Sequence, residues 1–206
     1  LGYSFVLHAL GALLGGTAVT LTIAVLVAVP DDEVAAVYAS GCFATISFIA
    51  VGARLGLPTS ATHGMIGGLA GAGLAAGGVH AVNWGGFDGI HPVGVVGALA
   101  VLVLSPVVGL VAGWASRRVA VRALSRGTRR MLGPVRGGIW VSAGAVALSD
   151  GTNDGQKAMG VAATTLLATG AIDSFEIPPS VRWSVALVFA LGTVVGGGRV
   201  VRRVGR

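Results

Sequence analysis

Long apolar segments, separated by short polar ones, make up most of this chain of 206 residues. Several apolar runs approach the roughly 20 residues that a helix needs to cross the hydrocarbon core of a bilayer. The pattern predicts a shorter glycine-rich helix between Pro58 and Val79, and spanning helices at 5–29, 34–53, 92–115, 137–172 and 182–198. We therefore expect an all-α polytopic membrane protein.

Polar residues are expected to interrupt this helical pattern at two places. Pro58 lacks a backbone donor, so a helix should begin just after it, with Thr59 or Ser60 as the N-cap. The fourth long run contains a polar stretch, 149–160, near its middle. We expect the helix to break within this stretch and Asp154 to begin the helical segment that follows.

Composition supports the membrane class. Charged residues make up 11% of the chain, against about 25% in an ordinary soluble domain, and the mean hydropathy is +0.85. The 35 glycines suit close packing of helices in lipid. The net charge of +6 arises from arginines at the ends of apolar runs, which favours a topology signal over nucleic-acid binding. The single cysteine, Cys42, excludes an internal disulfide.

The arginines also orient the predicted helices. Seven of the 14 Lys and Arg residues fall within 117–136 and four more in the C-terminal tail. Cytoplasmic loops carry such an excess, so both segments are expected to face the cytoplasm in a multi-pass protein of the cell membrane. The loops at 31–33, 80–91 and 173–179 then face the opposite side. A nucleic-acid or lipid-binding role for 117–136 is the alternative.

Candidate chemistry is concentrated in the polar stretch 149–160. Ionisable groups at membrane depth are functional candidates by default. The spacing of glycine and lysine does not fit a phosphate-binding P-loop, and Val161 stands where a calcium-binding EF-hand needs glutamate. The alternative is a self-neutralised kink in which Asp154 and Lys157 pair at helical spacing. The polar side chains of the stretch include Asp150, Thr152, Asn153, Asp154, Gln156 and Lys157.

A second polar group opens the glycine-rich helix. Free N–H groups and the positive end of the dipole make a helix start a natural anion site. The same residues can instead cap the helix and bond locally, and the sequence leaves both interpretations open. This group comprises Thr59, Ser60, Thr62 and His63.

Two motifs resemble those of inorganic phosphate transporters of the Pit family. Gly151-Thr-Asn-Asp154 matches the family's Gly-x-Asn-Asp core, and 156–160 matches the Gln-Lys-x-Met-Gly that bacterial members commonly carry. Residues 57–63 resemble the family's Leu-Pro-x-Ser-x-Thr-His motif. The C-terminal stretch also resembles the segment that follows the second signature, so the resemblance covers essentially the whole chain.

The resemblance implies an inverted-repeat transporter with broken or re-entrant helices. Family members carry one Asn-Asp motif and one Leu-Pro-x-Ser-x-Thr-His motif in each of two repeats. This chain lacks the first Asn-Asp motif and the second Leu-Pro motif, and it begins without Met. It is therefore similar to a central fragment, which alone is not expected to transport. Residues 1–115 would end the first repeat, 116–136 would form a basic cytoplasmic linker, and 137–206 would start the second.

The function that the resemblance implies is uptake of inorganic phosphate, coupled to H⁺ or Na⁺, across the cytoplasmic membrane. Asp150 and Asp154 would repel bare phosphate and are assigned to the coupling cation, with Asp154 as the candidate Na⁺ ligand. No cofactor, other metal or nucleic acid is expected; the bilayer is a partner, and a homo-oligomer is left open. The candidate phosphate-binding residues are Thr59, Ser60, Thr62, Thr152, Asn153, Gln156 and Lys157.

Three alternatives accompany this function: a sulfate or other oxyanion permease on the same scaffold, a membrane-embedded hydrolase, and a structural membrane subunit. Sulfate carries no proton at neutral pH, so a carboxylate that accepts a hydrogen bond from the substrate would favour phosphate. A hydrolase would use Asp150 and Asp154, but no histidine accompanies them in the motif. A shared phosphate site also requires hydroxyls of 59–62 to lie within about 10 Å of Asn153 or Asp154.

Overall fold

The computed structural model describes residues 2–57, 59–88, 91–125, 127–128 and 131–204. Apart from one short β-hairpin, the elements in these ranges are helical, as predicted. In chain order they are α1 (Gly2–Leu14), α2 (Ala18–Ala24), α3 (Asp31–Leu55), α4 (Ala61–Gly77), η1 (Gly78–Ala81), β1 (Gly86–Asp88), β2 (His91–Val93), α5 (Gly94–Leu124), α6 (Leu132–Ala168) and α7 (Pro179–Val204).

Two helices among the described residues, α3 and α5, are long and apolar enough to cross a membrane. A third crossing results if α1 and α2 are counted as one bent span. The most apolar window of α5 has a mean hydropathy of 2.6. The all-α membrane class is therefore confirmed, with fewer clear spans than the hydrophobic pattern predicts.

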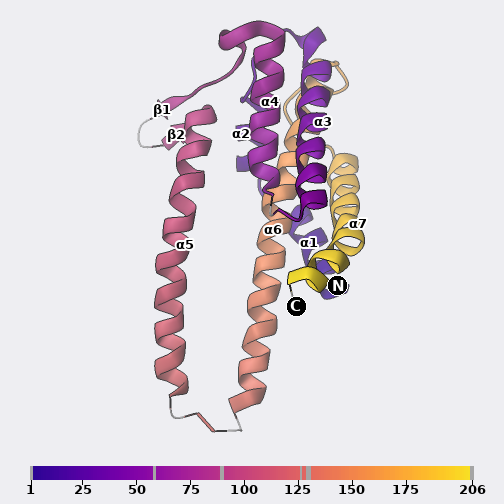
Figure 1. Ribbon diagram of the computed structural model, residues 1–206. Helices are drawn as coiled ribbons and strands as arrows, with labels where there is room; N and C mark the ends of the chain where they lie inside the picture. Colours follow the sequence, from indigo (N-terminus) through magenta and orange to yellow (C-terminus); the bar gives the residue numbers. More distant parts are fainter. Residues whose placement is uncertain (1, 58, 89–90, 126, 129–130, 205–206) are drawn as a thin grey trace.

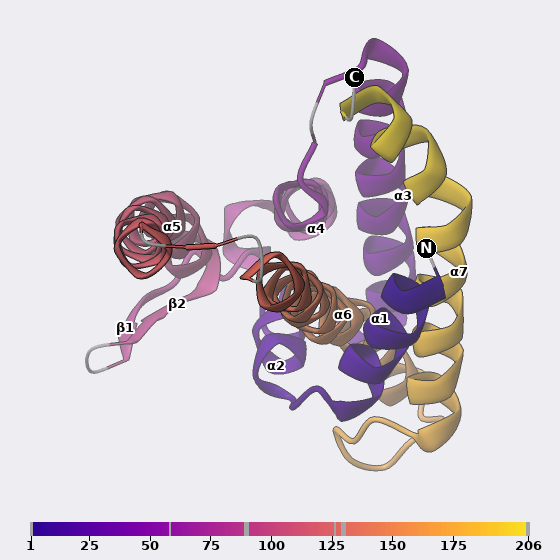
Figure 2. The same ribbon diagram turned by 90° about the horizontal axis from the view of Figure 1, so that it is seen from below.

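The helices form a bundle around the C-terminal half of α6, with α5 set apart from it (Figures 1 and 2). α1 and α2 pack against α6, α3 packs against α4, and α7 packs against α1. α5 contacts mainly the hairpin β1–β2 that precedes it and touches α4 at few positions. Figure 1 shows α5 and the N-terminal part of α6 extending together beyond the bundle.

The main hydrophobic core lies where α2, α3 and α4 meet. Tyr38 of α3 and Leu69 of α4 are almost completely buried there, together with Leu26, which follows α2. The Tyr38 hydroxyl is within hydrogen-bonding distance of two carbonyls at the end of α2, those of Ile23 at 3.1 Å and Ala24 at 3.0 Å. This contact ties the end of α2 to α3, while a smaller cluster joins α1, α6 and α7.

The first predicted span, 5–29, is wrong as a single helix. It forms α1 and α2, which are bent by 72° at a short break. Gly15 and Gly16 stand at this break, and each glycine in a helix costs about 1 kcal/mol relative to alanine. Beyond α2 the chain leaves the helical conformation and forms a β-bridge between Val27 and Val82.

The break predicted within 149–160 is also wrong. α6 runs through the whole polar stretch, and Asp154 lies inside this helix and not at its start. The glycines serve packing instead, because a Cβ at Gly151 would meet the backbone of His8, and Gly155 also lies against α1. The absence of side chains at these positions lets α1 approach α6 closely.

The basic loop predicted at 117–136 is largely helical. α5 continues to Leu124 and α6 begins at Leu132, so a short connection remains between them. Arginine is a good helix former, which allows α5 to extend past its apolar part. The helical arginines are Arg117, Arg118, Arg122 and Arg136, while Arg126, Arg129 and Arg130 lie outside the described residues. The division into repeats at 115 and 136 stays a prediction.

Candidate functional site

The two predicted polar segments meet at Lys157. Its ammonium group donates a hydrogen bond of 2.5 Å to Thr62 Oγ1 and lies 2.6 Å from Asp154 Oδ1. Thr62 belongs to the first turn of α4, whereas Asp154 lies three residues before Lys157 on α6. Figure 1 shows the start of α4 beside the middle of α6. The expected approach of the two segments is confirmed.

Lys157 is buried, and its carboxylate partner is less so. The side chain of Lys157 is 5% exposed and that of Asp154 is 34% exposed. An ammonium group at this depth requires a counter-charge, which Asp154 provides. This is the ion pair of the self-neutralised alternative, but the helix that carries it has no break. The Asp154 side chain is only partly covered by the described residues.

The hydroxyl residues at the start of α4 have different roles: one caps the helix and another contacts Lys157. Ser60 has an extended backbone and accepts a 3.4 Å hydrogen bond from the backbone N–H of His63, so the N-cap predicted at Thr59 or Ser60 is Ser60. Thr59 packs against α3, where a Cβ at Gly52 would meet its methyl group. Of the three candidate hydroxyls, that of Thr62 contacts Lys157.

Thr152 and Gln156 lie against the break between α1 and α2. The Thr152 hydroxyl is 3.1 Å from the carbonyl of Gly11 and 3.0 Å from that of Leu148. Gln156 is 5% exposed, and its Oε1 accepts a 3.0 Å hydrogen bond from the backbone N–H of Val19. In this conformation both side chains stabilise the broken helix.

Sequence reasoning missed two further residues that hold the broken helix to its neighbours. The Thr20 hydroxyl donates to the Gln156 carbonyl at 3.0 Å, and Arg182 Nη1 of α7 donates to the Leu13 carbonyl at 3.2 Å. The last carbonyls of a helix lack partners inside it, so Leu13 needs an outside donor. The pair Gly15-Gly16 within a spanning run is the signal that could have predicted a helix break here. Backbone groups freed by a break in lipid need hydrogen-bond partners from neighbouring segments, so polar residues near such a break are candidates.

Asp150 and Asn153 stand apart from the contact at Lys157. Both are exposed on α6. Asp150 lies one helical turn before Asp154 and therefore on the same face. Within the described residues, no group of three or more His, Cys, Asp or Glu side chains is arranged to hold a metal ion. The structure thus brings together Thr62, Asp154 and Lys157 from the predicted set.

The chain matches the phosphate transporter family over its whole length. The sequence model of the phosphate transporter family matches residues 1–132 and 118–206. A probable low-affinity inorganic phosphate transporter of Mycobacterium leprae is 35% identical over 99% of this chain and 48% of its own length. Proteins of the same description from Bacillus subtilis and Rhizobium meliloti are 32% and 34% identical, each over 73% of this chain and 43% of the relative.

The chain spans about half the length of these relatives. No solved structure matches it. The family matches together cover the chain, and they include both motifs whose side chains meet at Lys157. From these matches, the chain belongs to the phosphate transporter family, a family of membrane permeases and not of enzymes.

Proposed function

We propose that the protein carries inorganic phosphate across the cytoplasmic membrane, driven by a gradient of H⁺ or Na⁺. Thr62, Asp154 and Lys157 form part of its substrate site in this proposal. The observation that carries it is the buried ammonium group of Lys157, held between a hydroxyl of α4 and a carboxylate of α6. The names of the relatives, probable low-affinity inorganic phosphate transporters, support the choice of substrate.

The contact at Lys157 offers donors for an anion. An ammonium group has three N–H bonds, and two of them point to Thr62 and Asp154. The third can be donated to a phosphate oxygen. Thr62 accepts from Lys157, which leaves its own hydroxyl hydrogen to donate. The first N–H groups of α4 and its positive dipole end lie beside them and favour an anion as well.

Asp154 supplies a mechanism for coupling. Its carboxylate is paired with the Lys157 ammonium group and would repel an approaching phosphate. A proton or Na⁺ bound at the exposed side of Asp154 would weaken the pair and release the ammonium group toward phosphate. Asp150, on the same face, would add a second carboxylate for the cation. Cation and phosphate would then each favour the binding of the other, which is the thermodynamic requirement for symport.

The remaining candidates take different parts in this proposal. Thr152 and Gln156 position α1 and α2 around the site, as their contacts suggest. Ser60 fixes the first turn of α4, and Thr59 packs that turn against α3. Asn153, exposed on the face of α6, remains a candidate donor to phosphate.

The test separates binding from coupled uptake in the complete protein, reconstituted in vesicles. Lys157→Met removes a charged donor and should weaken phosphate binding by about 10- to 100-fold. Asp154→Asn keeps the shape but removes a charge, so it should abolish gradient-driven uptake while leaving some phosphate binding. Asp173→Asn, in the exposed loop after α6, is the matched control and should change neither.

Two outcomes would contradict this assignment. Equal loss of binding and uptake in Asp154→Asn at saturating cation would remove the separate role of the carboxylate. Competition by sulfate as strong as that by unlabelled phosphate would favour the oxyanion permease instead.

The orientation of the chain is part of the same proposal. The arginine-rich end of α5 would lie in the cytoplasm and the turn after α4 on the opposite side. In a Cys42→Ser background, an impermeant thiol reagent added to intact cells should label a cysteine at position 80 and miss one at position 122. The reverse pattern would invert the topology.

A further inference from the structure

We propose that the end of α5 is a binding site for an anionic phospholipid. The site is the α5 arginine surface, a shallow hollow lined by Trp114, Arg117, Arg118, Val121 and Arg122. The arginines would hold the lipid phosphate, and the acyl chains would lie along the apolar part of α5. This role is separate from phosphate transport at Lys157.

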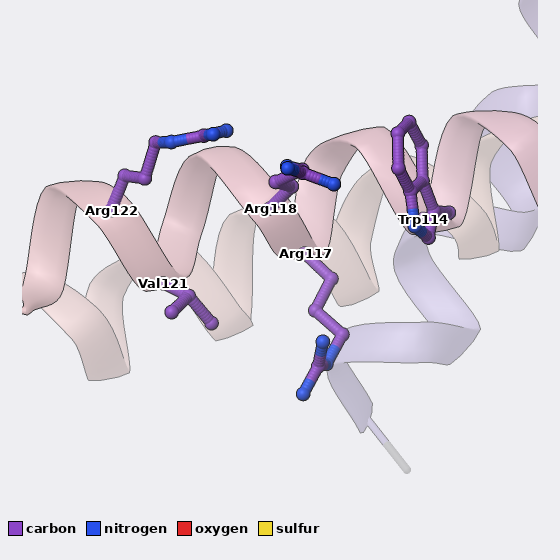
Figure 3. A pocket seen from close by; sticks show the side chains of 5 residues that line it. All are labelled: Trp114, Arg117, Arg118, Val121 and Arg122. Atoms are coloured by element: carbon purple, nitrogen blue, oxygen red, sulfur yellow. The ribbon is translucent and has the colours of Figure 1, made fainter.

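The side chains of the α5 arginine surface are arranged around one end of a spanning helix. The Arg118 guanidinium lies over the Trp114 ring, 5.2 Å from its centroid, in a cation–π contact. Figure 3 shows the side chains of Arg118 and Arg122 leaning along α5 toward Trp114, while Arg117 and Val121 project from the other side of the helix. A phosphate beside Trp114 would therefore meet the guanidinium groups of Arg118 and Arg122 on this side of the helix.

The protein provides little negative charge to neutralise these arginines. The sequence has no Asp or Glu between Asp88 and Asp150. Among the residues that the structure describes, the ion pair found is Lys157–Asp154, far along the chain from α5. Guanidinium groups bind phosphate through paired hydrogen bonds, so an anionic headgroup complements the surface in both charge and shape.

The apolar surface next to the arginines distinguishes a lipid from other anions. The most apolar window of α5 is only 11% buried within the chain. Val103, Val107 and Leu110 are among its exposed side chains. Trp114 is 58% exposed and lies where this apolar surface gives way to arginine, the position that tryptophan occupies at membrane interfaces. A nucleic acid or an acidic peptide would use the charges but not the adjoining apolar face.

The experiment measures contact between Trp114 and lipid acyl chains in the complete protein, reconstituted in nanodiscs. Brominated phosphatidylglycerol or brominated phosphatidylcholine is added at equal mole fraction, and the quenching that depends on Trp114 is obtained by difference from a Trp114→Phe variant. The anionic lipid should be enriched at Trp114 at least about fivefold, the factor that one arginine near a membrane surface is typically worth.

Variants then assign the preference to the arginines. Replacing Arg117, Arg118 and Arg122 with Gln should bring quenching by the anionic lipid down to the level of the neutral one. Replacing them with Lys should keep most of the preference, because the charge remains. Arg54→Gln, at the end of α3, is the control for an arginine elsewhere and should leave the preference unchanged.

Three results would overturn the proposal. They are equal quenching by both lipids in the unchanged protein, a preference that survives the triple Gln replacement, and a preference abolished by millimolar inorganic phosphate. The first would mean that another part of the protein or a different partner covers this surface. The last would mean that the hollow takes free phosphate and not a lipid headgroup. None of these outcomes depends on whether the protein transports phosphate.

Discussion

The two helical segments with unusual residues at mid-length behave in opposite ways. The segment of α1 and α2 has apolar and small side chains around its centre, yet its helix breaks and bends by 72°. The segment of α6 carries two carboxylates, two amides and an ammonium group near its centre, yet it continues through all of them. Side-chain polarity therefore does not decide where these helices break. We infer that such a break forms where neighbours satisfy the backbone that it exposes.

α6 supplies much of that satisfaction. The side chain of Gln156 accepts from the backbone N–H of Val19, and Arg182 of α7 donates to the carbonyl of Leu13. The hydroxyl of Thr20 donates to the backbone carbonyl of Gln156 and so ties α2 to α6. The polar stretch of α6 therefore has two faces. The face of Thr152 and Gln156 stabilises the break, and the side chains of Asp154 and Lys157 pair with each other and reach α4. In a helix, residues three or four apart share a face, so Thr152 and Gln156 can serve one neighbour while Asp154 and Lys157 serve another.

The largest expected effect on stability comes from removing the counter-charge of Lys157 in α6. Asp154→Leu leaves the Lys157 ammonium group buried without a counter-charge, and should lower the free energy of unfolding by about 3 kcal/mol. Adding Lys157→Met removes the orphaned charge, so the double variant should recover most of this loss. Reversible unfolding of the purified protein by titration with detergent measures the free energy of unfolding of both variants. A double variant no more stable than Asp154→Leu would mean that the pair does not keep α6 intact.

The second prediction compares glycines inside and outside the α1–α6 contact. Gly151→Ala places a Cβ against the backbone of His8, which cannot move as a side chain can, and should destabilise by about 2 kcal/mol. Gly109→Ala, on the uncovered part of α5, has no heavy atom within 4 Å of the new Cβ. It should be neutral or stabilise by up to about 1 kcal/mol through helix propensity. Equal effects in the same titration would show that α1 does not depend on this close approach.

Much of this structure follows from the sequence because local signals agree with the global fold. The apolar runs of α3 and α5 predict their spans, Pro58 precedes a helix capped at Ser60, and two motifs meet at a shared lysine. The apolar run predicts α3 to within three residues at either end. The loop predicted at 31–33 is wrong, because these three acidic residues form the first turn of α3, where their charge complements the helix dipole.

The rest could not be predicted because it depends on contacts between distant segments. Whether Gly151 frees the backbone or admits another helix is decided by α1, which lies more than a hundred residues away in sequence. Gln156 is chemically suited to bind an anion, yet its carbonyl oxygen accepts from Val19, whose N–H is available only because α1 ends early. Arg117 and Arg118 could stand in a loop or a helix, and the extension of α5 selects the helix.

The third prediction tests whether Gln156 stabilises the break. Gln156→Leu keeps the side chain's bulk but removes the acceptor of the Val19 N–H, which should cost about 1 kcal/mol. Amide hydrogen exchange at Val19 should accelerate by about fivefold, the factor that corresponds to this energy. Exchange in α3 should stay unchanged, since Tyr38 ties it to α2 through other carbonyls. Unchanged exchange at Val19 would assign Gln156 back to a role in substrate binding alone.

The smallest expected effect comes from raising the helix propensity of the residues at the break. Gly16→Ala meets no neighbour within 4 Å and removes about 1 kcal/mol of the local preference against helix. If the contacts from α6 and α7 determine the break, the bend should persist. Spin labels at positions 6 and 21, both exposed, measure this in a Cys42→Ser background. A continuous helix would separate their backbones by about 22 Å. The bent pair should give a shorter distance in both the unchanged protein and Gly16→Ala, and lengthening toward the straight value would show that two glycines alone produce the break.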